Sequence, residues 1–70
     1  MRKADDYHLS RSALEHLIDE WIFNARDRAI VKRRLLDGIH YEPLAEEFDL
    51  SVQQTKEIVY KANEILMKHV

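Results

Sequence analysis

The chain has no cysteine, and its 70 residues include only one glycine and one proline. Without cysteine there is neither a disulfide nor a thiolate zinc site. So few turn-forming residues favour a few long helices over many short strands. No apolar run approaches the roughly 20 residues that a membrane-spanning helix needs, and the N-terminal MRKADDYHLS has no apolar signal core. We therefore expect a cytoplasmic protein without a membrane partner.

The chain also lacks the positive charge that is usual in DNA-binding domains. Its formal net charge is −2, whereas the electrostatic mark of such a domain is a basic patch. Residues 1–37 carry 8 basic and 7 acidic side chains, and residues 38–70 carry 3 basic and 6 acidic ones. Because neutralised phosphates supply most non-specific affinity for DNA, an isolated monomer is expected to bind DNA weakly.

Motifs for catalysis and for metal binding are missing as well. The four histidines, His8, His16, His40 and His69, lack the i, i+4 spacing of a helical metal pair. No glycine-rich phosphate loop and no nucleophile with a motif context is present. We expect neither an enzyme nor a bound cofactor.

The composition is that of a folded helical domain, with 46% apolar and 34% charged residues. A chain of this length buries only about 60% of its unfolded surface, so its core is small. We predict a frayed N-terminal segment over residues 1–9 and one all-α domain over residues 10–70.

The first two helices are predicted from their caps. Helix one should begin near Ser10 or Ser12, and Ser12 with Glu15 fits a capping box. Asn24 should cap a second helix over residues 25–37, which ends before Gly38. The apolar stripe of the first helix consists of Leu14, Leu17, Ile18, Trp21 and Ile22.

The signals that follow predict a short helix, a tight turn and a long helix. The short helix covers residues 41–48, with Pro43 in its first turn, where a missing N–H costs nothing. Asp49 and Leu50 form the turn, and Ser51 caps a helix that reaches about Lys68. This order is the pattern of a helix-turn-helix, whose last helix commonly enters the major groove of DNA. The expected fold is a four-helix domain that contains a helix-turn-helix.

The predicted core lies around this unit. Along the last helix, the buried stripe should be Thr55, Ile58, Ala62, Ile65 and Leu66. Across the domain, the core should centre on Leu36, Ile39, Leu44, Ala45, Phe48, Leu50, Ile58, Ala62 and Ile65.

Residues 28–66 resemble region four of bacterial sigma factors, the helix-turn-helix that reads the −35 promoter element. RAIVKRRLLDGIHYEPLAEEF is similar to that family's helix ending in glycine and the short helix after it. FDLS resembles the turn and cap, and KEIVYKANEIL resembles the amphipathic last helix. The similarity covers about the last 40 residues. It implies a small transcriptional regulator of phage or mobile-element type. The sequence given has no counterpart of the upstream sigma regions, so we do not expect a complete sigma factor.

The resemblance also implies which residues touch DNA. Bases would meet the side chains that follow the cap, where glutamine pairs with adenine and glutamate accepts from cytosine. This chain departs from the family in having only Lys56 as a basic residue there, and Thr55 where an aliphatic residue is expected. The predicted DNA-binding residues are Val52, Gln53, Gln54, Lys56, Glu57, Tyr60, Lys61, Arg33 and Lys32.

A second function stays open beside DNA binding. The same fold can act as a protein-interaction module that docks on RNA polymerase or on another regulator. Trp21 and Phe23 cannot face the same way, so one is expected to be exposed, which indicates a partner surface and allows a homodimer through the first helix. The acidic second half favours this alternative. The basic residues Arg26, Arg28, Lys32, Arg33 and Arg34 favour double-stranded DNA.

Overall fold

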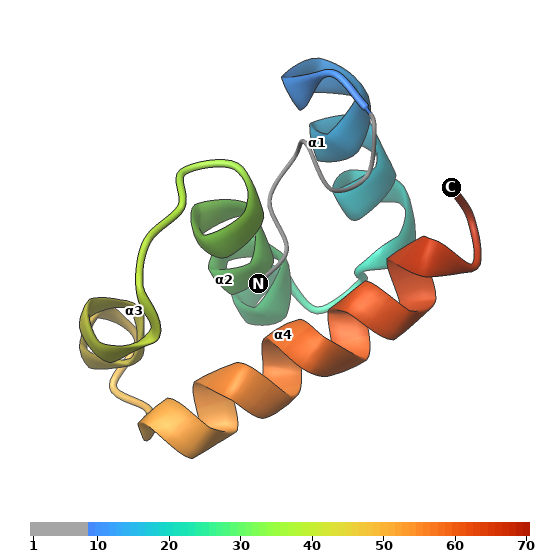
Figure 1. Cartoon of the computed structure of the whole chain (residues 1–70). Coiled ribbons are helices and arrows are strands. Elements are labelled where there is room, and N and C mark those ends of the chain that lie inside the picture. The colour runs from blue at the N-terminus through green and yellow to red at the C-terminus, as the bar shows by residue number, and fades with distance from the viewer. Residues whose placement is uncertain (1–8) are drawn as a thin grey trace.

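The computed structural model describes residues 9–70 as a set of packed helices (Figure 1). The predicted all-α, four-helix class is confirmed for this part of the chain. Residues 1–8 of the predicted frayed segment lie outside the described residues, and Leu9 packs against the core. The elements are α1 (Arg11–Trp21), α2 (Ala25–Leu35), α3 (Tyr41–Glu47) and α4 (Val52–Met67).

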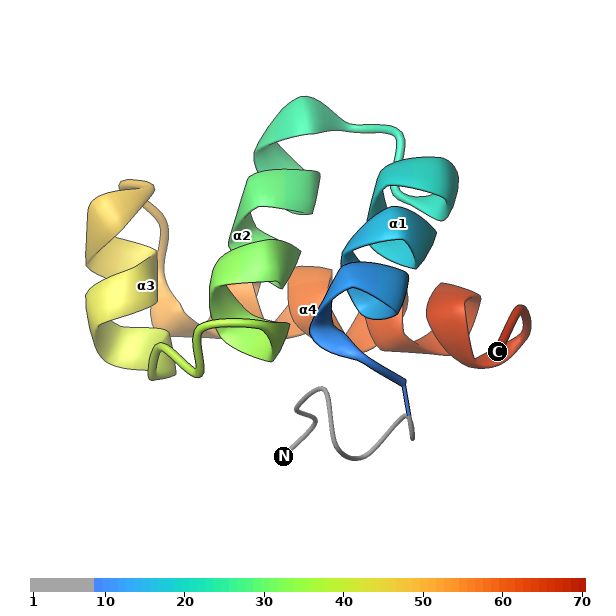
Figure 2. The same ribbon diagram turned by 90° about the horizontal axis from the view of Figure 1, so that it is seen from above.

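The longest helix, α4, supports the other three. It contacts α1, α2 and α3, and it runs along one side of the molecule beneath all of them (Figures 1 and 2). α1 and α2 lie side by side, and α3 crosses α4 steeply in both views. Because α4 packs on every other helix, its buried face is committed to the core and its opposite face is left outward.

Side-chain caps mark the starts of α1 and α2, whereas α3 begins after His40 without a side-chain cap. Ser10 caps α1, with its hydroxyl oxygen accepting from the Ala13 backbone N–H at 3.1 Å. The predicted capping box of Ser12 and Glu15 is therefore wrong, because both residues lie inside the helix. Asn24 caps α2 as predicted, through its acceptance from the N–H of Asp27 at 3.0 Å.

The turns after α2 and α3 both use left-handed backbone. α2 ends at Leu35, two residues before the predicted end, and Gly38 takes a φ of 70°. After α3, Asp49 takes a φ of 57°, and the Leu50 N–H donates to the Ala45 carbonyl at 2.9 Å. This short turn places Ser51 as the cap of α4, as the sequence predicted.

The core is divided into two clusters, one on each side of α2. The first joins α1, α2 and α4 around Leu14, Ile18, Val31, Leu35 and Leu66, and the second joins α2, α3 and α4 around Ile30, Leu44 and Val59. Of the predicted core centre, Leu44, Ala45 and Ala62 are buried. The other six are only half-buried and pack at the edges: Leu36, Ile39, Phe48, Leu50, Ile58 and Ile65.

The buried stripe of α4 differs from the predicted one. Val59, which the sequence pattern did not select, is fully buried, whereas its neighbour Ile58 is half-buried. Thr55 is also fully buried, and its hydroxyl donates to the Ser51 carbonyl at 2.9 Å. Since that hydroxyl is satisfied within its own helix, threonine can occupy a position where an aliphatic residue was expected.

A buried cation lies between α2 and α3. Arg34 is 1% exposed, although the sequence placed it among the basic residues that favour DNA. Its Nη1 donates to the Ile39 carbonyl at 2.8 Å, and its guanidinium lies 4.5 Å from the centre of the Tyr41 ring. Its Nε and Nη2 are buried and have no hydrogen-bond partner among residues 9–70. Arg34 is therefore a packing residue that orders the α2–α3 connection.

This placement predicts that the volume of Arg34 matters more than its charge. Arg34→Met keeps a long side chain but removes the donor to Ile39, and should lower the unfolding free energy by about 1 kcal/mol. Arg34→Ala also leaves a cavity and should cost about 2–5 kcal/mol. Urea unfolding followed by circular dichroism measures both. Equal losses in the two variants would show that the charge, and not the packing, is what matters.

Candidate nucleic-acid interface

The N-terminus of α4 is fixed by a reciprocal capping box. The hydroxyl oxygen of Ser51 accepts from the Gln54 backbone N–H at 3.0 Å, and Gln54 Oε1 accepts from the Ser51 backbone N–H at 3.0 Å. Two backbone donors of the first turn are thereby satisfied. Gln54 Oε1 is engaged in the cap, while its Nε2 makes no hydrogen bond within residues 9–70. In the exposed side chain of Gln54, the oxygen thus belongs to the cap and the amide nitrogen can donate to a ligand.

The other predicted base-contacting residues are also on the outward side of the first turns. Gln53 and Glu57 are exposed, one turn apart, and Gln53 Nε2 donates to Glu57 Oε2 at 3.4 Å. Val52 is half-buried at the first helical position. The structure therefore brings Gln53, Gln54 and Glu57 together on one exposed surface, as the resemblance implied.

Three lysines follow this surface along α4. Lys56 is half-buried and its Nζ lies 5.8 Å from the centre of the Tyr41 ring, while the exposed Tyr60 meets the same ring edge-on at 6.3 Å. Lys61 and Lys68 are exposed. None of the three lysines forms an ion pair within the described part of the chain. Lys68 was missed by sequence reasoning, although it lies two turns beyond Lys61 on the same face.

The two predicted phosphate contacts on α2 point elsewhere. Lys32 Nζ lies 2.6 Å from Asp19 Oδ1 and 3.9 Å from a Glu15 carboxylate oxygen, so it is held against α1. Arg33 donates through Nε and Nη2 to Glu47 Oε1 at 3.1 and 2.8 Å. Neither side chain is paired with a residue of α4.

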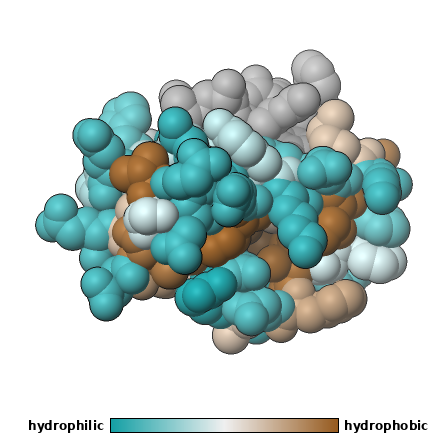
Figure 3. Space-filling view, turned by 90° about the horizontal axis from the view of Figure 1, so that it is seen from below, coloured by the Kyte–Doolittle hydropathy of each residue, from teal (hydrophilic) through white to brown (hydrophobic). Residues whose placement is uncertain are grey.

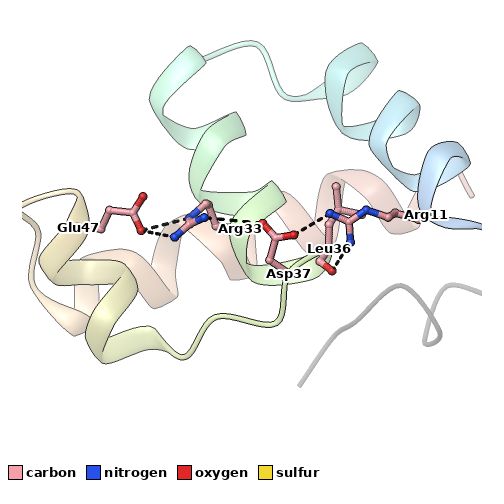
Figure 4. A network of polar contacts seen from close by, with 5 residues as sticks. All are labelled: Arg11, Arg33, Leu36, Asp37 and Glu47. Carbon is pink, nitrogen blue, oxygen red and sulfur yellow. Dashed lines mark hydrogen bonds and ion pairs between the residues drawn. The ribbon is translucent and has the colours of Figure 1, made fainter.

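A row of charges runs across the ends of three helices (Figure 4). From α3 it passes from Glu47 to Arg33 on α2, then to Asp37 at 3.9 Å, and from Asp37 to Arg11 on α1 at 2.7 Å. Arg11 Nη1 also donates to the Leu36 carbonyl at 2.7 Å. The cations of α1 and α2 in this row are therefore neutralised by carboxylates of the same molecule.

Because the cations of α2 are paired internally, the charge that matters for DNA is that of α4. The acidic excess of residues 38–70 comes from α3 and the turn after it, which carry four acidic side chains and no basic one. On α4 itself, Lys56 and Lys61 balance Glu57 and Glu64, and Lys68 follows as the C-cap. The helix expected to read DNA, taken with its C-cap, thus has one positive charge in excess, although the half of the chain that contains it is acidic.

Next to this surface, a groove separates α4 from the α1–α2 connection. Its volume is about 590 Å³. Apolar side chains of Ile22, Ile58 and Ile65 line it, and Gln54 and Lys61 stand at its α4 edge. Viewed from the α4 side, the surface has an apolar hollow between hydrophilic side chains (Figure 3). Sequence reasoning placed Ile58 and Ile65 in the core, and the shift of the buried stripe to Val59 is what leaves them at this groove.

The two aromatic residues beside the groove have different surroundings. Trp21, the last residue of α1, stacks on His69 with ring centres 3.6 Å apart and planes 3° from parallel. Phe23 lies after the end of α1 and is 78% exposed. The expectation that one of the pair is exposed is therefore met by Phe23, on the α1–α2 connection rather than on α1 itself.

No other kind of site stands out in residues 9–70. No three side chains of histidine, aspartate or glutamate gather there in a way that could hold a metal ion. None of the helices in this region is long and apolar enough to cross a bilayer. Comparison with models of known families, with curated proteins and with solved structures finds no match to this chain.

The ion pair between α1 and α2 lowers the pKa of a carboxyl group, that of Asp19. The hydrogen bond from Lys32, supported by the positive charges of Lys32 and Arg28, holds the pKa of Asp19 below its usual value. Because the folded pKa is the lower one, the Asp19 pair stabilises the fold at neutral pH. That contribution is lost as the pH falls through the lowered pKa.

We therefore predict that Asp19→Asn is less stable than the wild type at neutral pH and that the two converge in acid. Urea unfolding at a series of pH values between neutral and acidic tests this. Glu20→Gln is the control, since the exposed Glu20 on the same helix has no ion pair within residues 9–70. A constant difference between Asp19→Asn and wild type at every pH would contradict the assignment.

Proposed function

We propose that this chain is a DNA-binding transcriptional regulator that inserts α4 into the major groove. One observation carries the proposal. The outward face of one capped helix carries the amides of Gln53 and Gln54 together with lysines that form no ion pair within residues 9–70. That helix follows a short turn and crosses the preceding short helix steeply, as the recognition helix of a helix-turn-helix does.

The residues divide into two roles. Gln53, Glu57 and the free Nε2 of Gln54 face the base edges, where amides suit adenine and a carboxylate suits the amino group of cytosine. Lys56, Lys61 and Lys68 neutralise phosphates on either side. α4 and its C-cap supply only these three cations, so we propose a modest affinity for DNA, with sequence preference supplied by the first two turns of α4.

Docking on RNA polymerase or on another regulator is the second candidate. The observation that favours it is the pairing of Lys32 and Arg33 with carboxylates, which leaves α2 with little to offer a phosphate. In that case α4 and the α1–α2 connection present a mixed apolar and charged surface to a protein. The two candidates differ in the response of DNA affinity to changes on α4.

The capping box allows a substitution that separates fold from DNA contact. Gln54→Glu keeps an oxygen acceptor for the Ser51 N–H, and glutamate suits the first turn of a helix, so stability should be unchanged or higher. The same change removes the Nε2 donor and adds a negative charge facing DNA. Affinity for a preferred site, first selected from a randomised duplex pool, should fall by about 1–3 kcal/mol. Fluorescence anisotropy measures the affinity and thermal melting the stability.

Unchanged affinity of Gln54→Glu for the selected site, or the failure of wild type to enrich any site from the pool at low salt, would reject groove reading. The protein-docking candidate would then be preferred. Gln54→Ala is a less useful variant, because it also removes half of the cap.

The ion pair between α2 and α3 gives an independent test. Glu47→Gln removes the 2.8 Å ion pair that holds Arg33 against α3 and leaves it only Asp37 at 3.9 Å. On the proposed function, α3 crosses the DNA backbone, so Arg33 can then turn to a phosphate. Affinity for all sequences should rise, and the dependence of log affinity on log salt should steepen by about one unit. Glu42→Gln, which changes the net charge equally on the same helix without releasing a cation, is the matched control. Equal effects of the two substitutions would show that Arg33 does not reach DNA.

A further inference from the structure

The groove between α4 and the α1–α2 connection has its own exposed aromatic neighbour. Phe23 is one of the residues that line it, and it is 78% exposed. The groove is in the volume range of about 300–1,000 Å³ that is usual for ligand sites, at about 590 Å³. One face of the molecule thus combines an apolar anchor with an apolar recess that can receive one.

The backbone that carries Phe23 is held on both sides. The Ile22 carbonyl accepts from Arg28 Nη1 at 3.1 Å, and Ile22 itself is 5% exposed. Asn24 is fixed as the cap of α2. Since its neighbours are fixed, burying the Phe23 ring costs little ordering of the chain, and such pre-ordering favours association.

The charges around the groove select among occupants. Arg26 and Asp27 line it on the α2 side, and Glu57 and Lys61 on the α4 side. Arg26 and Asp27 pair with each other at 3.0 Å, and Glu57 and Lys61 carry opposite charges, so neither side of the groove has a net charge that would attract a polyanion or a strongly basic segment. The surface does suit a copy of itself, because Phe23 and the apolar recess belong to one face of the same chain, and a two-fold axis lets each copy place Phe23 in the recess of the other.

We propose that two copies of this chain form a dimer in which Phe23 of each enters the groove of the other. The dimer covers Gln54, Glu57 and Lys61, which line the same groove. These are residues that the proposed function assigns to DNA, so on that function the dimer is a form that does not bind DNA. Self-association and DNA binding then compete for the same surface. The fraction of molecules whose recognition helix is free to bind DNA therefore falls as the protein concentration rises.

Sedimentation equilibrium without DNA, from low to high micromolar concentration, tests the dimer. Wild type should show a concentration-dependent monomer–dimer equilibrium. Phe23→Ser should raise the dissociation constant by more than about tenfold, as the loss of a central aromatic anchor does. Its melting temperature should stay close to wild type because the ring is exposed in the monomer. Met67→Ser removes another exposed apolar side chain, away from the groove, and should leave the dimer intact.

A charge reversal provides a second pair of variants. Lys61→Glu gives each groove an excess of negative charge and should weaken the dimer several-fold, more so at low salt. Lys68→Glu makes the same change in charge at the C-cap of the same helix, outside the groove, and should have little effect. Wild type that stays monomeric at high micromolar concentration, or dimers that Phe23→Ser leaves unchanged, would overturn the proposal. The first result would assign the groove to another protein instead.

DNA titrations separate this inference from the proposed function. If both hold, DNA should dissociate the wild-type dimer, and Phe23→Ser should match wild-type affinity in dilute solution but exceed it when the protein is concentrated. A dimer that binds no DNA retains the interface and rejects the proposed function. A third outcome is that the dimer binds DNA and Phe23→Ser still dissociates it while DNA is bound. That result would overturn the claim that dimer formation and DNA binding exclude each other.

Discussion

The position of α3 depends on one long side chain that is buried at the end of α2. Arg34 reaches under the connection that follows Gly38, donates to the Ile39 carbonyl and lies against the Tyr41 ring. Tyr41 is in turn the residue against which Tyr60 packs and near which Lys56 lies. The chain of contacts therefore runs from α2 through α3 to the outward side of α4. A helix of only seven residues has little stability of its own, so these contacts give α3 its place.

Features with local causes could be predicted from the sequence. Asn24, Gly38 and Ser51 act within a few residues of themselves, and each does in the structure what its residue type favours. The features that were not predicted depend on contacts between helices. Ile58 and Val59 are both apolar and adjacent, so periodicity alone did not decide which one faces the core, and the prediction chose the wrong one. Arg34 looked like a surface cation because nothing near it in the sequence shows that the α2–α3 connection folds over it.

The candidate site was predictable to a similar extent. The resemblance directed attention to the first turns of α4, and the structure does place Gln53, Gln54 and Glu57 together there. It did not indicate that Gln54 has a second task in the cap, or that Lys32 and Arg33 are engaged by carboxylates from α1 and α3. The number of charged residues in a stretch of sequence says little about the charge of a surface. Ion pairs neutralise the cations of one helix, here α2, and leave those of another, here α4, unpaired. The groove was not predicted for the same reason that the buried stripe of α4 was wrong. Ile58 and Ile65 line the groove because Val59, and not Ile58, occupies the core.

The stacking of Trp21 on His69 makes the intrinsic tryptophan fluorescence of the molecule sensitive to its structure. Trp21 is the only tryptophan in the chain, and it lies at the junction of three parts: the end of α1, the residues after α4 and the edge of the groove. Indole emission shifts with the polarity of its surroundings, so the fluorescence of the unlabelled protein is sensitive to events at this junction. Displacement of the C-terminal residues and covering of the groove change the surroundings of the ring in opposite directions, by adding water in the first case and removing it in the second. A single emission spectrum can therefore distinguish fraying of the end of α4 from occupation of the groove.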